Sequence, residues 1–98
     1  MIIVTGSVHA RPETIDQVLA LSLEHVRRSR AEPGCELHAA HIDAEDPLHV
    51  VFVEHWTDAA VLRVHFGVPA SRAFVEELGA LSAAPPSIAI YDARPASI

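Results

Sequence analysis

The 98-residue sequence contains no lysine, no asparagine, one cysteine and few aromatic side chains. Seven arginines stand against 13 acidic residues, and the formal net charge is −6 with histidine neutral. Nucleic acids are bound mainly through clustered cations, so this balance argues against nucleic-acid binding. The single cysteine cannot form an internal disulfide, and nothing indicates an oxidising compartment, so the cytoplasm is the expected location.

Long hydrophobic runs are also missing. The longest stretch without a charge, residues 78–91, is too short to span a bilayer and contains two adjacent prolines. The first residues have no basic segment before their short apolar run, which argues against a signal peptide. We therefore expect no membrane segment. Because no linker, repeat or low-complexity segment interrupts the chain, we also expect a single domain over residues 1–98.

The apolar periodicity changes cleanly along the chain and predicts the element order βαββαβ. Strands are predicted over residues 2–10, 35–43, 48–56 and 87–92. Helical spacing begins near Pro12, and two further short helices are predicted on either side of Gly67. With right-handed crossovers, this order predicts an α+β fold, a ferredoxin-like sandwich in which helices cover one face of an antiparallel sheet.

The second face of the predicted sheet needs cover of its own. All four strands carry apolar residues on both faces, which a two-layer domain would leave in water. We therefore expect a homodimer that is joined sheet to sheet.

The hairpin between the second and third strands decides which side chains meet. A four-residue loop, 44–47, would place His38 opposite Val53. In that register Glu54 and Trp56 lie under the helices and His38 lies on the open face. The register is a hypothesis that depends on the length of the loop.

Seven histidines invite a metal-site hypothesis, but their spacing does not support one. The sequence has no HExxH, HxH or cysteine–histidine motif. It also has no glycine-rich nucleotide loop, so we expect neither a metal nor an organic cofactor.

Two polar residues on the predicted apolar faces are candidates for chemistry. The Glu54 carboxylate lies between apolar neighbours, where burial raises the pKa of a carboxyl group unless it is paired. It is either a general base or polar anchor, or a structural group that is bonded to a backbone amide or lies at the solvent-exposed end of the sheet. His65 follows Val61 by four residues, so its ring turns toward the sheet. It either lines a pocket or is a core histidine bonded to one backbone carbonyl.

Three motifs together resemble the antibiotic biosynthesis monooxygenase (ABM) family of dimeric α+β-barrel proteins. They are Glu32-Pro33-Gly34-Cys35 before the second strand, the E-x-W ending of the third strand, and a helical histidine nine residues later. The resemblance implies a small monooxygenase that uses O2, without flavin or metal, on a quinol or polyphenol. A haem-degrading branch of the same superfamily relies on an asparagine, which this chain lacks, so haem degradation is not expected.

The resemblance also implies roles for individual residues. His65 and Glu54 are the catalytic candidates, with His65 as the base and Glu54 holding its tautomer. The substrate-binding candidates are Trp56, Phe52, Phe66, Phe74 and His38. His38 stands where many relatives carry an aromatic side chain. Two other classes stay open: a non-catalytic dimeric binder of a small aromatic or lipid-like metabolite, and an interaction protein without a pocket.

Overall fold

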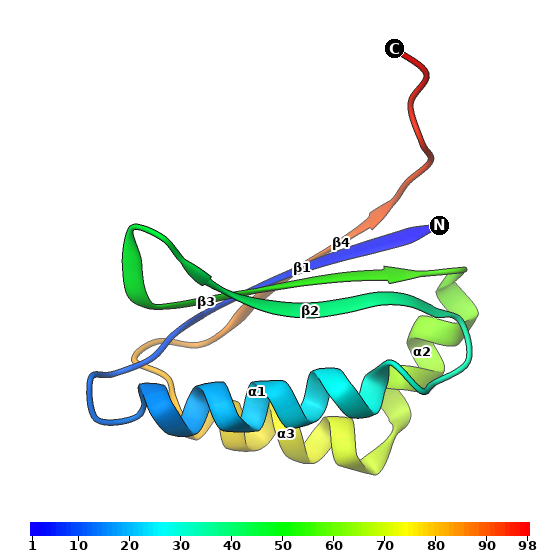
Figure 1. The fold of residues 1–98 in the computed structure, drawn as a ribbon. Coiled ribbons are helices and arrows are strands. Elements are labelled where there is room, and N and C mark those ends of the chain that lie inside the picture. The colour runs from blue at the N-terminus through cyan, green and yellow to red at the C-terminus, as the bar shows by residue number, and fades with distance from the viewer.

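A four-stranded antiparallel sheet forms one layer of the computed structural model, which describes residues 1–98, and three helices lie on one side of the sheet (Figure 1). The strands are β1 (Ile2–His9), β2 (Cys35–Asp43), β3 (Asp46–Trp56) and β4 (Ser87–Asp92). The helices are α1 (Ile15–Ser29), α2 (Ala59–Gly67) and α3 (Pro69–Leu81). The spatial order β2-β3-β1-β4 confirms the predicted ferredoxin-like α+β fold.

Local chemistry sets the ends of the helices. The Thr14 hydroxyl accepts a hydrogen bond from the Arg11 backbone N–H and donates one to the carbonyl of Leu81, which ties the start of α1 to the end of α3. The Asp58 carboxylate caps α2 by accepting from the Val61 backbone N–H. Gly34 has a φ of +80°, and a Cβ there would stand 2.6 Å from a Val61 methyl group. The turn from α1 into β2 therefore requires glycine.

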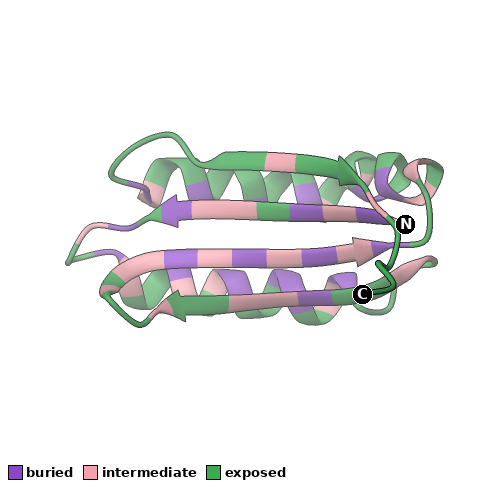
Figure 2. Ribbon diagram, turned by 90° about the horizontal axis from the view of Figure 1, so that it is seen from above, coloured by how far each residue is buried: buried purple, intermediate pink, exposed green.

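Most of the core lies between β1, β3 and the helices. On β3 every second residue from Val50 to Trp56 is buried, and on β1 Ile2, Val4 and Val8 are buried; Figure 2 shows the buried positions of these two middle strands from above. One core cluster gathers around Phe52 and Phe74, and a second gathers around Val4 and Trp56. By contrast, β4 is exposed along most of its length (Figure 2).

The predicted hairpin register is wrong by one residue. The turn is shorter than expected, because β3 begins at Asp46, and the pairing is irregular at both ends of β2. His38 consequently lies opposite Glu54 rather than Val53. A shift of one residue moves a strand's side chains to the other face, so His38 lies under the helices and not on the open face.

The face of the sheet opposite the helices has no cover from the chain itself. Ile3, Val51 and Val53 are only partly buried there, and Tyr91 is 54% exposed. None of the helices has the length and apolar character that crossing a membrane requires.

Candidate functional site

A cavity of about 410 Å³ lies between the sheet and the helices. This volume is in the range of pockets that hold small organic molecules. Apolar side chains of the sheet and of α3 form much of its wall, and they include Val8, Phe52, Phe74 and Leu78. A cavity of this kind argues against the class of interaction proteins without a pocket.

Glu54 enters the cavity from β3 and is held by two neighbours. The indole N–H of Trp56 donates to Glu54 Oε1 over 2.8 Å. His38 Nε2 lies 3.3 Å from the same oxygen, in a contact that lacks the geometry of a hydrogen bond. Burial acts to raise the pKa of Glu54, but His38 and the indole outweigh it, so this pKa lies below its usual range. Glu54 is therefore a buried carboxylate ion near neutral pH.

His65 reaches the cavity from α2 and is oriented by a carboxylate from the turn before β2. Glu32 Oε1 lies 2.8 Å from His65 Nδ1. A carboxylate only accepts, so Nδ1 carries the proton and Nε2 is the atom that can receive one. The ring is 3% exposed and packs against Trp56, with ring centres 4.6 Å apart.

His25 approaches from α1 and completes the polar side of the cavity. Its ring stacks on Phe74 at 3.9 Å, and the Arg28 guanidinium donates to its Nδ1 over 2.9 Å. Burial, together with the neighbouring His38 and His65, lowers the pKa of His25 to about 3. This imidazole is therefore neutral at physiological pH.

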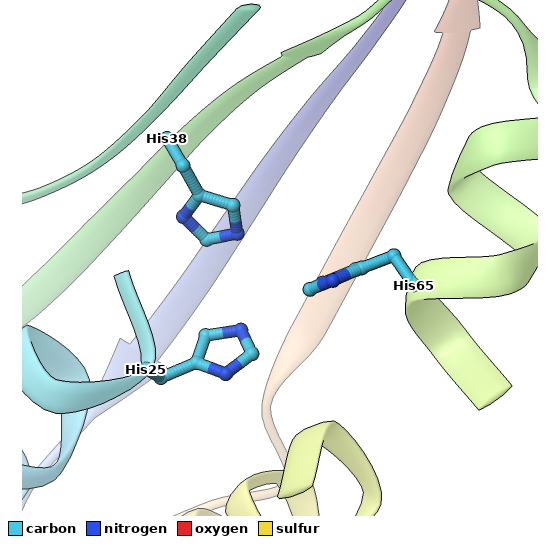
Figure 3. A group of neighbouring side chains, drawn as sticks. All are labelled: His25, His38 and His65. Atoms are coloured by element: carbon cyan, nitrogen blue, oxygen red, sulfur yellow. The ribbon is translucent and has the colours of Figure 1, made fainter. Parts of the chain in front are cut away.

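The rings of His25, His38 and His65 point toward one another from three different elements (Figure 3). One nitrogen of each ring lies within 4.8 Å of one nitrogen of each of the others, and all three residues are buried. We call these residues the histidine trio. Spacing along the sequence did not reveal it, because its members come from α1, β2 and α2.

The sequence profile of the antibiotic biosynthesis monooxygenase family matches residues 1–77. The chain belongs to this family. A crystal structure of an antibiotic biosynthesis monooxygenase is 34% identical, with a TM-score of 0.89, and the match covers 97% of this chain and 100% of that one. A candidate antibiotic biosynthesis monooxygenase from Deinococcus radiodurans is 25% identical, with a TM-score of 0.94 and coverage of 100% and 97%.

One curated relative is the uncharacterized protein sll1783 of Synechocystis sp. It is 34% identical over 90 residues, which cover 92% of this chain. The chain spans only about 61% of the length of that relative.

Most of the site residues predicted for this ABM protein face one space. The cavity is lined by His65, Glu54, Phe52, Phe66, Phe74 and His38. Trp56 does not line it, because its fully buried indole lies behind Glu54 and His65. The expected bond between Glu54 and His65 is not formed, since Glu32 takes that place.

Two residues of the site were missed from the sequence. The sequence indicated Glu32 only as the first residue of the Glu32-Pro33-Gly34-Cys35 motif. His25 follows Val18 by seven residues and Ser22 by three, so helical spacing places it on the buried face of α1. That spacing was the signal available for His25, whereas nothing local pairs Glu32 with a residue 33 positions away.

Proposed function

We propose that this ABM protein is a monooxygenase that oxidises a small quinol or polyphenol with O2 and needs no cofactor for turnover. The observation that carries the proposal is the Glu32–His65 pair, a carboxylate-oriented imidazole at the edge of an aromatic-walled cavity. A general base of this kind must reach the substrate, and a quinol in this cavity would lie beside His65 Nε2.

His65 is the base in the first step. Its Nδ1–H donates to Glu32, which keeps the tautomer in which Nε2 has a free lone pair. A phenolic proton moves to Nε2, and the Glu32 carboxylate stabilises the resulting imidazolium. Glu54 is not the partner of this base, so its role is separate.

His38 is the residue that faces the developing negative charge. Neither of its ring nitrogens has a hydrogen-bond partner, although its side chain is fully buried. An imidazole N–H supported by the Glu54 carboxylate can donate to the phenolate oxygen or to reduced O2. Trp56 cannot do this while its N–H is bonded to Glu54, so it serves as a positioning residue.

The substrate itself supplies the electrons. The phenolate passes one electron to O2, and the radical pair recombines with a carbon–oxygen bond. Loss of water then leaves a hydroxylated quinone. One oxygen atom of O2 enters the product and the other leaves as water, so a hydroquinone and O2 balance without an external reductant. Phe52, Phe66 and Phe74 offer the flat apolar contacts that an aromatic ring requires.

Oxygen uptake with a panel of hydroquinones tests the proposal. Chelator-treated protein should consume one O2 per quinol, and with ¹⁸O2 one labelled atom should enter the product. Uptake that requires added flavin or metal would contradict it. If all quinols are inert but aromatic ligands still bind, the chain is a binder rather than an enzyme.

We further propose that two copies pair through the open face of the sheet. The support is the row of partly buried apolar side chains on a face that the helices do not cover, among them Ile3, Val51 and Val53. Light scattering at micromolar concentration should give a dimer mass. Val53→Glu should give a monomer, whereas Ala73→Glu on the exposed surface of α3 should leave the dimer intact. A monomeric wild-type protein would contradict this arrangement.

A further inference from the structure

Within the histidine trio, His38 is the member whose buried ring nitrogens lack a hydrogen bond. Both ring nitrogens of His38 lack a hydrogen bond, and this residue is 1% exposed. A buried polar atom without a partner costs free energy, so it points to a ligand that satisfies it. The groups facing His38 are Glu54 Oε1, 3.3 Å from Nε2, and the rings of His25 and His65, whose centres lie 5.2 and 5.6 Å away.

The trio has two carboxylate neighbours. Glu54 and Glu32 flank it, and Glu32 Oε2 is a second buried acceptor without a partner. Three cations lie near the trio: Arg28 donates to Nδ1 of His25, Arg30 donates to the backbone carbonyl of His38, and Arg72 lines the same cavity. The two carboxylates are nevertheless the charged groups in direct contact with the rings of His38 and His65, so they can support a divalent cation beside these rings.

The spacing of the trio is close to that of a metal site. The three candidate ligand atoms lie within 4.8 Å of one another. Two nitrogens on a tetrahedral zinc ion, each about 2.0–2.1 Å from the metal, are about 3.3 Å apart. Rotation of the imidazole side chains can close the difference. Glu32 already holds Nδ1 of His65, which is the carboxylate–histidine arrangement that supports metal ligands.

We propose that His25, His38 and His65 bind one divalent transition-metal ion, with Zn²⁺ as the representative, and leave its remaining coordination position open to the cavity. Three imidazoles suit zinc, copper, nickel and iron better than the hard ions magnesium and calcium. The ion supplies a partner for the ring of His38, which has no hydrogen bond, and lies close to the two carboxylates.

Metal binding would change two features of the site, the bond from Arg28 to His25 and the free lone pair of His65. Arg28 donates to Nδ1 of His25, so binding through Nε2 moves a proton to Nδ1 and breaks that contact. Binding through Nε2 of His65 takes the lone pair that the proposed base uses. The proposal does not rest on the proposed function, but it predicts that the metal inhibits quinol turnover.

Calorimetric titration of chelator-treated protein with Zn²⁺ at pH 7.5, without substrate, tests the site. We expect one ion per chain with a Kd of about 1 μM or tighter. Cobalt(II) should give the visible absorption bands that are typical of four-coordinate cobalt, and zinc should displace the cobalt ion. Weak binding with no defined stoichiometry would overturn the proposal.

Matched variants separate the trio from other histidines. His38→Ala and His65→Gln should each weaken zinc binding more than about 100-fold. Glu32→Gln, which keeps all three ligands, should weaken it about 10–100-fold. The surface variant His9→Ala/His49→Ala removes another pair of histidines near two carboxylates and should leave the affinity unchanged. Loss of binding in the surface variant alone would show that zinc binds there and would overturn the proposal.

A gain of affinity guards against loss through misfolding. Arg28→Met removes the competing donor and the nearest positive charge, so zinc should bind up to about tenfold more tightly. In the wild type and in this variant, zinc should also raise the melting temperature. Weaker binding by Arg28→Met would count against the trio as the site. Zinc binding is measured without substrate, so it does not depend on turnover. A protein that binds zinc but takes up no O2 with any quinol would contradict only the proposed function.

Discussion

The protein contains two groups of histidines that differ in what surrounds them. On the surface, His9 and His49 stack in parallel with ring centres 4.3 Å apart. His49 also bonds to Ser7 through Nε2 and to Asp43 through Nδ1. In the interior, the trio of His25, His38 and His65 is enclosed by the sheet and helices, and His38 has no hydrogen-bond partner.

The comparison shows that burial, rather than the number of histidines, creates a chemical site. Water and nearby carboxylates satisfy the surface pair, so a ligand has little to add. In the interior, a ring nitrogen without a hydrogen bond raises the free energy of the folded protein. Electrostatic interactions are also stronger there, because water is excluded. The same side chain is therefore a surface contact in one region and a candidate base or ligand in the other.

The largest expected difference between the two groups is catalytic. His65→Ala should lower quinol turnover about 10²–10⁴-fold, because it removes a general base. His49→Ala should leave turnover unchanged. Steady-state O2 consumption of both variants measures the difference. Near-full activity of His65→Ala would remove His65 as the base and make Glu54 the next candidate.

The pH dependence of stability should be next in size. His25 is neutral in the folded protein down to a pKa of about 3, whereas its ordinary pKa is 6.5. The unfolded chain therefore binds a proton that the folded chain does not between these values, and stability falls as pH decreases from 6.5 toward 3. Between pH 6.5 and pH 4 the loss should be on the order of 3 kcal/mol.

Urea unfolding at pH 7 and pH 4 measures this effect in His25→Gln and in the exposed control His41→Gln. The first variant should lose much of the difference between the two pH values, and the control should retain it. Part of the loss should remain in both, because the lowered pKa of Glu54 makes stability fall in the same direction as pH drops below the ordinary glutamate pKa of 4.5. Equal behaviour of the two variants would mean that His25 is not buried as a neutral group.

The hydrogen bond from the Trp56 indole to Glu54, behind the trio, should contribute less to stability than the burial of His25 as a neutral group. Trp56→Phe keeps the aromatic ring but removes the donor to Glu54, which should lower stability by about 1–3 kcal/mol. Combining it with Glu54→Gln in a double-mutant cycle measures the coupling. Additive effects would show that the two side chains do not interact in solution.

The smallest effect should be that of the surface pair. His9→Ala/His49→Ala removes exposed or half-exposed ionic contacts, which typically contribute about 0–1 kcal/mol. Chemical denaturation should place the variant within that range of the wild type. A loss as large as that of a buried variant would erase the contrast between the two groups.

Periodicity along the sequence was sufficient for the fold. Alternation in β1 and β3 and the helical spacing of α1 are local patterns, so each element could be predicted from its own residues. The motifs around Glu32, Glu54 and His65 also indicated the family from the sequence alone. These signals can be detected in the sequence because each depends on residues that are close neighbours along the chain.

The arrangement of the site was decided in three dimensions. The short turn before Asp46 and the irregular pairing of β2 moved His38 to the helix side, and no local pattern announces such a shift. Glu32 and His65, or His25 and His38, meet only because the βαββαβ order folds distant elements onto one face of the sheet. The sequence alone therefore determined which elements form and which family they resemble. The tertiary structure decided which imidazoles share a cavity, because partners brought together by packing have no fixed separation along the chain.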